Sequence, residues 1–244
     1  MNASVKALVL RETEYKESSR ILTVLSDSLG KLTLVAKGAK RRGSRTAAAA
    51  QLLTYSEMSI SCSRGRWYLN EAATIEIFPG LRNDLRKLTC GSYFAELLET
   101  VGDEDSPDPE ILRLGLNCLN ALSEGSREDR LVKAVFEMRL MCLAGYEPSL
   151  DACAVCGDES ENNPFFDISG GVLLCGSCAG GDAFRLCDSS LAALRHVTSC
   201  QAQRILSFRL SGEALNRFCY VCEQYVTHHL ERHFHILDYL NNLE

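Results

Sequence analysis

The chain has 244 residues, of which 46% are hydrophobic and 24% are charged, and its formal net charge is −6. This composition is that of an ordinary globular protein with ample material for a core, and the length favours two domains plus a small module. No stretch approaches the roughly 20 consecutive apolar residues of a membrane-spanning helix.

The beginning of the chain and its 12 cysteines bear on the cellular compartment. Residues 1–11 contain no uninterrupted apolar h-region of a signal peptide and no small-residue cleavage site, so we expect no signal peptide. A cytoplasmic protein with reduced thiols is therefore expected, rather than a secreted protein with disulfides.

Charge is unevenly distributed along the chain. Residues 1–80 contain 12 Lys or Arg and 7 Asp or Glu, whereas residues 81–244 contain 14 and 25. The first part has a net charge of +5 and the second a net charge of −11. A basic N-terminal part on an acidic body indicates an anionic partner for the N-terminal part only.

Residues 1–80 have the apolar and alternating patterns of five β-strands, with glycine-containing turns at 26–30 and 63–65. The expected strands are Val5–Leu10, Arg20–Leu25, Lys31–Ala36, Glu57–Cys62 and Trp67–Phe78. Five short strands in about 80 residues predict a small closed barrel of the OB (oligonucleotide- and oligosaccharide-binding) type.

A basic segment, residues 37–45, lies between the third and fourth strands. Gly38 and Gly43 keep its backbone pliable, and its cations are Lys37, Lys40, Arg41, Arg42 and Arg45. Lysine and arginine bind phosphates in a strongly salt-dependent way, and OB barrels bind single strands across a sheet face and its loops. The segment therefore predicts nucleic-acid binding, and the alternative is an ordinary solvated loop.

The hairpin that follows the fourth strand adds Arg64, Arg66 and Trp67. The two arginines add positive charge, and Trp67 could stack on a base. Trp67 is also the only tryptophan and lies near a strand start, so it could equally belong to the core.

The period of the apolar residues becomes helical from Leu81. Helices are expected at 81–101, 110–122 and 128–143, with an acidic loop at 102–109. The third has apolar residues on nearly every side, which predicts the buried centre of a bundle. Two more helices are expected at 191–197 and 213–234.

Four cysteines form two tight pairs, Cys153 with Cys156 and Cys175 with Cys178, in a C-x2-C-x18-C-x2-C pattern. This spacing suits one tetrahedral zinc ion, and four thiolates would leave no open position for water. Residues 164–174 between the pairs read as a hairpin that turns at 169–171, which together predicts a structural zinc ribbon. The alternatives are two unrelated reduced pairs or a redox motif.

Other candidate sites are weaker. Cys219 and Cys222 share the apolar face of the last helix and are interpreted as small buried hydrophobic residues. His229 and His233 could clamp a metal one turn apart, although an exposed helix end explains them too. The sequence contains no phosphate-binding, dinucleotide-binding or nucleophile-elbow motif, so we do not expect an enzyme.

The order of these segments resembles the bacterial RecO family along essentially the whole chain. The residues that carry the resemblance are Val5–Leu10, Tyr15–Leu22, Gly30–Arg42, Gln51–Tyr55 and Phe136–Pro148, the last of which leads into Cys153. The resemblance implies an N-terminal OB fold (1–80), a helical C-terminal domain in two parts (81–149 and 183–244) and an embedded zinc module (150–182).

The resemblance also implies a function. RecO proteins are recombination mediators that bind single- and double-stranded DNA, anneal complementary strands and act in the RecFOR pathway. They work with RecR, and in some lineages RecF, to load RecA onto strands coated by single-stranded DNA-binding protein (SSB), whose acidic tail they bind. Carried over to this sequence, Lys37, Lys40, Arg41 and Arg42 would contact DNA, with Arg20 and Lys31 as weaker candidates.

Two other functions remain open from the residues alone. One is a zinc-ribbon adaptor that binds RNA or protein in transcription or translation. The other is a nuclease whose carboxylates are scattered in sequence and clustered in space.

Overall fold

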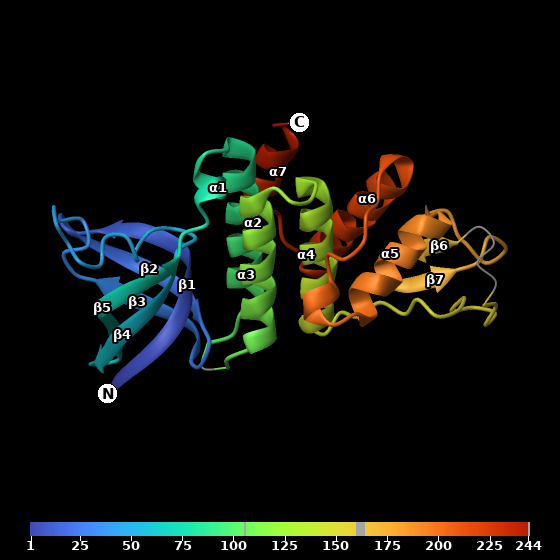
Figure 1. Ribbon diagram of the computed structural model, residues 1–244. Helices are drawn as coiled ribbons and strands as arrows, with labels where there is room; N and C mark the ends of the chain where they lie inside the picture. Colours follow the sequence, from blue (N-terminus) through green and yellow to red (C-terminus); the bar gives the residue numbers. More distant parts are fainter. Residues whose placement is uncertain (105, 160–163, 244) are drawn as a thin grey trace. The chain divides into compact units, whose positions relative to one another are not determined.

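The computed structural model describes residues 1–104, 106–159 and 164–243 (Figure 1). The expected acidic loop at 102–109 and the expected zinc module at 150–182 each include residues outside this part. The chain forms two compact units, one of residues 1–125 with 235–244 and one of residues 126–234. No described helix has the length and apolar character needed to cross a bilayer.

The first unit contains the predicted five-stranded closed barrel, in the order β1-β2-β3-β5-β4. Its strands are β1 (Asn2–Tyr15), β2 (Ser19–Ser26), β3 (Gly30–Ala36), β4 (Tyr55–Ser63) and β5 (Arg66–Glu76). A register shift between Val9 and Arg11 bends β1, so that its first half pairs with β4 and its second half with β2. Closure between β3 and β5 is parallel and short, through Leu34–Trp67 and Val35–Tyr68.

Alternating apolar residues of the strands fill the barrel. They include Val5, Ala7 and Val9 of β1 and Met58 and Ile60 of β4, all nearly inaccessible to solvent. The segment between β3 and β4 also enters this core, through Ala39 and Ala50.

The helices of the first unit are α1 (Pro79–Arg82), α2 (Leu85–Val101), α3 (Pro109–Glu124) and α7 (His235–Asn241). The predicted continuous helix from Leu81 is wrong at its start, because the Asp84 side chain accepts hydrogen bonds from the backbone N–H groups of Arg86 and Lys87 and begins a new helix there. Strand β5 ends two residues earlier than predicted. The Glu76 carboxylate accepts the backbone N–H groups of Ile77 and Phe78, which turns the chain.

The second unit contains α4 (Asp129–Leu143), α5 (Asp188–Ser199), a short 3₁₀ turn at Ala202–Arg204 and α6 (Gly212–His229). Helix α4 contacts both α5 and α6, and most of its residues from Leu131 to Met141 are buried. This confirms the prediction of a buried central helix.

The predicted helix over 213–234 is wrong at its C-terminal end. Helix α6 stops at His229, and Glu231 has a φ of 47°, a left-handed conformation that breaks the helical hydrogen-bond ladder. Residues 235–241 form the separate helix α7. His229 and His233 are therefore not one turn apart on a helix. The His229 ring nitrogen Nε2 instead lies 3.0 Å from the backbone oxygen of Ile168.

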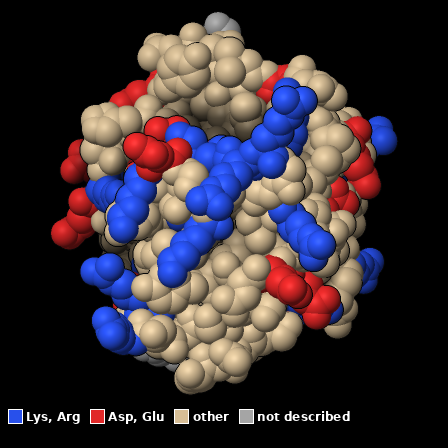
Figure 2. Space-filling model, turned by 90° about the vertical axis from the view of Figure 1, so that its left-hand side faces the viewer, with Lys and Arg blue, Asp and Glu red and all other residues tan. Residues whose placement is uncertain are grey.

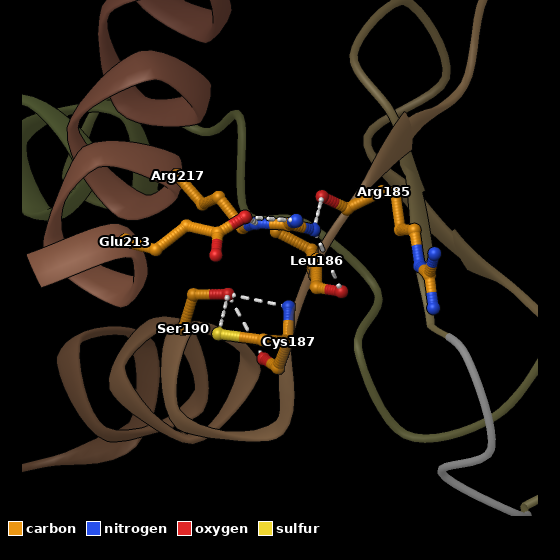
Figure 3. Close-up of polar contacts among 6 residues, drawn as sticks. All are labelled: Arg185, Leu186, Cys187, Ser190, Glu213 and Arg217. Atoms are coloured by element: carbon orange, nitrogen blue, oxygen red, sulfur yellow. Dashed lines mark hydrogen bonds and ion pairs between the residues drawn. The ribbon is translucent and has the colours of Figure 1, made fainter.

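Hydrogen bonds fix the chain where it enters α5 (Figure 3). Arg217 of α6 pairs with Glu213 and donates to the backbone oxygens of Arg185 and Leu186. The Ser190 hydroxyl accepts the backbone N–H of Cys187, which caps the first turn of α5. These contacts hold a short strand, β8 (Phe184–Arg185), that the sequence did not predict because it has only two residues.

Candidate nucleic-acid interface and metal centre

The four predicted cysteine ligands come together in the second unit. Their Sγ atoms all lie within 4.8 Å of one another, and those of Cys156 and Cys175 are 3.7 Å apart. A tetrahedral zinc ion with Zn–S bonds of about 2.3 Å requires S–S separations of about 3.8 Å. The donor set and its spacing therefore fit one zinc ion held by Cys153, Cys156, Cys175 and Cys178.

A small hairpin positions the two cysteine pairs. Strands β6 (Phe165–Asp167) and β7 (Val172–Leu174) pair around a turn at residues 168–171, close to the prediction. The backbone N–H of Ala154 donates to the oxygen of Leu173, which ties the first cysteine loop to β7. In each loop a backbone N–H, of Gly157 or Cys178, donates back to the first cysteine's carbonyl oxygen.

The four thiols are electrostatically unequal. Hydrogen bonds from the backbone N–H groups of Cys156 and Cys175 lower the pKa of the Cys153 thiol to about 6. Hydrogen bonds with the sulfurs of Cys175 and Cys156 raise the pKa of Cys178 to about 12. Adjacent thiolates repel one another, so a divalent cation is needed to hold all four as thiolates.

In the first unit, two buried alanines and a backbone hydrogen bond anchor the basic segment to the barrel. Ala39 and Ala50 are buried in the barrel core, and the backbone N–H of Lys40 donates to the oxygen of Ser18. Gly38, just before the first anchor, and Gly43, between the two, have φ values of 69° and 79° and allow the chain to turn there. Arg41, Arg42 and Arg45, which lie between the two alanines, are exposed to solvent on a backbone that is anchored on both sides.

The predicted cations fall into two groups. Five arginines are exposed, and among the described residues none forms an ion pair with them: Arg41, Arg42, Arg45, Arg64 and Arg66. Lys37 is also exposed and lies over the Tyr68 ring, 4.4 Å from its centroid. These six charges are available to a ligand.

The other three predicted cations are engaged within the protein. Lys40 pairs with Glu14 at 2.6 Å, and Arg20 pairs with Glu12 at 2.5 Å. Lys31 donates to the backbone oxygen of Glu99 in the last turn of α2, where a cation is favourable.

Two adjoining hollows form a groove where β3 meets β5. One, of about 510 Å³, is lined by residues that include Lys31, Arg66 and Trp67. The other, of about 540 Å³, is lined by residues that include Lys37, Arg41 and Arg66. They share Tyr15, Val35 and Arg66. Figure 2 shows the face of the barrel that lies on the left in Figure 1, with Lys and Arg in a diagonal band and Asp and Glu to either side.

The structure adds groove residues that the sequence did not single out. Tyr15, Lys16 and Tyr68 line the groove, and Lys16 lies 5.2 Å from the centre of the Tyr15 ring. No local motif marks them, because the end of β1 and the start of β5 reach the groove only when the barrel forms. Trp67 is half-buried, packs against the barrel core and also lines the groove, so both sequence interpretations apply to it.

Comparison with protein families agrees with this architecture. The family described as Recombination protein O C terminal matches residues 82–238, and that described as Recombination protein O N terminal matches residues 1–78. The chain belongs to the RecO family. The RecO N-terminal match covers the barrel, and the C-terminal match covers α2 to α6, the start of α7 and the four cysteines.

Individual RecO relatives are similar along nearly the whole chain. The DNA repair protein RecO of Acetivibrio thermocellus is 30% identical over 239 residues, which cover 97% of this chain and 95% of the relative. That of Alkaliphilus metalliredigens is 29% identical over 237 residues, 95% of each chain. That of Thermoanaerobacter sp. is 28% identical over 241 residues, 98% of this chain and 97% of the relative.

Proposed function

We propose that this chain acts in DNA repair as a recombination mediator that binds single- and double-stranded DNA and anneals complementary strands. With RecR, and with or without RecF, it helps load RecA onto SSB-coated DNA and binds the SSB tail. The observation that carries the proposal is a groove lined by unpaired cations and aromatic rings in a chain of the RecO family.

The residues of the groove suit a single strand. Arg41, Arg66 and Lys37 offer charge to phosphates, and Tyr15 and Trp67 offer ring surface to bases. Each stacked base is worth about 1–3 kcal/mol in such sites and is largely independent of sequence. A protein that anneals arbitrary strands needs this sequence tolerance.

Annealing requires no bond to be made or broken. It requires two polyanions to be held close together, their repulsion screened and their bases free to pair. We assign one strand to the groove and the attraction of the second strand to Arg42, Arg45 and Arg64, which are exposed and do not line the groove. The protein is proposed to act as a mediator and not as an enzyme.

Annealing of two labelled complementary oligonucleotides, bare and SSB-coated, tests this function. We expect the protein to accelerate annealing on both substrates. The double variant Arg41→Glu/Arg42→Glu should lose at least about tenfold in DNA affinity at low salt, because two phosphate contacts become repulsions.

The matched control is Arg204→Glu/Arg209→Glu, which changes the net charge equally at two exposed arginines of the second unit. It should anneal like the wild type. Equal loss in both variants would assign the effect to net charge alone. A preference for structured RNA would favour the adaptor function, and Mg²⁺-dependent cleavage would indicate a nuclease.

A further inference from the structure

Two carboxylates of β1 form ion pairs with cations that were predicted from the sequence to contact DNA. Glu14 pairs with Lys40 and Glu12 pairs with Arg20. Residues two apart in a strand point to the same side, so Glu12 and Glu14 form an acidic edge on β1 beside the basic segment.

Glu14 lies close to both cations. It hydrogen-bonds to Lys40, and in the β1–β2 pairing it stands directly opposite Arg20. The hydrogen bond and charge of Lys40, with a smaller contribution from Arg20, lower the pKa of the Glu14 carboxyl. Glu14 is therefore a carboxylate at neutral pH.

The pair of Glu14 and Lys40 is accessible to a competing anion. The Glu14 side chain is 80% exposed and that of Lys40 29% exposed. The backbone N–H of Lys40 donates to the oxygen of Ser18, which lines the groove, so the Lys40 side chain starts from the groove's edge. An exposed pair of this kind contributes little to folding, so its loss should leave the barrel intact.

We propose that the Glu14 carboxylate competes with DNA phosphates for the Lys40 ammonium and so lowers the affinity of the barrel for DNA. This inference rests on the proposed DNA binding. A protein that brings strands together and hands them on must also release them, and a tethered carboxylate limits affinity without removing a cation.

The test is the affinity of the full chain for a labelled oligothymidine, measured by fluorescence anisotropy over a salt series. Glu14→Gln should bind about two- to fivefold more tightly than the wild type at low salt. Its slope of log K against log salt should be steeper by about 0.7, the contribution of one more phosphate contact on a single strand.

The matched control is Glu17→Gln. Glu17 is exposed in the turn after β1 and, among the described residues, takes part in no ion pair. The two variants change the net charge equally within a few residues. Glu17→Gln should therefore give less than half of the affinity gain, and its slope should equal that of the wild type.

Lys40→Gln, made in both backgrounds, decides between restraint and general electrostatics. It should have little effect in the wild type, where Glu14 holds the ammonium, and should abolish the gain in Glu14→Gln. Equal gains from Glu14→Gln and Glu17→Gln would overturn the inference. So would an equal loss from Lys40→Gln in both backgrounds.

Failure of the inference is distinguishable from failure of the proposed function. Wild-type binding that depends on Arg41 and Arg42 but is unchanged by Glu14→Gln overturns the inference alone. Absence of DNA binding in both the wild type and Glu14→Gln overturns both. Unchanged circular dichroism and melting of each variant show that the fold is kept.

Discussion

At the scale of single residues, whether a cation is available to bind DNA depends on whether a carboxylate of the protein pairs with it. Arg41 and Lys40 are neighbours in the sequence, yet among the described residues Arg41 meets no acid and Lys40 meets Glu14. Composition and order revealed the basic segment. They could not reveal which of its charges are neutralised, because Glu14 and Lys40, 26 positions apart in the sequence, are brought together by the pairing of β1 with β2 and of β2 with β3.

Lys133 shows the same dependence in the buried part of the second unit. Its ammonium lies 2.7 Å from carboxylate oxygens of both Glu137 and Glu223, and the Glu137 side chain is inaccessible to solvent. Burial alone would lower the pKa of Lys133, but the charges of Glu137 and Glu223 outweigh it and raise the pKa above its ordinary value. The stabilisation that the charged Lys133 gives to the folded protein is therefore fully present below the pKa of an unfolded lysine, about 10.4. It is lost as the pH rises through the pKa of Lys133 in the folded protein.

We expect Lys133→Met to destabilise the protein by about 3–5 kcal/mol at pH 7, because it leaves a buried carboxylate without its cation. Urea unfolding followed by circular dichroism measures this. Lys6→Met, at an exposed lysine of β1, is the control and should cost less than about 0.5 kcal/mol. Equal, small effects would show that the buried cluster contributes nothing specific.

At the scale of elements, strong local periodicity predicted the structure well. The five strands, the α4 core helix and the cysteine hairpin all follow from alternation, helical period and glycine turns. The points at which helices begin and end were harder to predict. Asp84 before α2 is a recognisable cap residue that the apolar period alone overlooked. The end of α6 at His229 depends instead on the left-handed backbone conformation of Glu231, which has no sequence signal.

The four-cysteine module is the element whose stability we expect to depend on a bound ion. We expect Cys175→Ser to lose one equivalent of bound zinc, because three thiolates no longer close the tetrahedron. Melting should shift downwards, by about 2–4 °C for each kcal/mol lost. Zinc content by a colorimetric chelator and calorimetry measure both effects.

Cys200→Ser is the matched control within the same unit, since Cys200 lies outside the four-sulfur cluster. It should keep its zinc and its melting temperature. DNA affinity should be unchanged in Cys175→Ser, because the proposed DNA contacts lie on the barrel. Full zinc content and unaltered melting in Cys175→Ser would contradict the structural role of this site.

At the scale of the whole molecule, an acidic protein presents a basic groove. The net charge of −6 would predict repulsion from DNA if charge were spread evenly. The excess of Lys and Arg in residues 1–80 instead becomes a band on one side of the barrel (Figure 2). Local field, rather than total charge, then governs the approach of a polyanion.

The number of available cations predicts how binding depends on salt. When no second strand is present, the cations assigned to it can also bind the first strand. One oligothymidine can then place a phosphate on each of six cations: Lys37 and the five arginines without ion pairs, Arg41, Arg42, Arg45, Arg64 and Arg66. At about 0.7 counterions per contact on a single strand, log K against log salt should have a slope near −4. Anisotropy titrations with oligothymidine from low to physiological salt measure it. A slope near zero would show that base stacking alone holds the strand, and a slope far steeper than −4 would mean that the paired cations Lys40, Arg20 and Lys31 also reach phosphates.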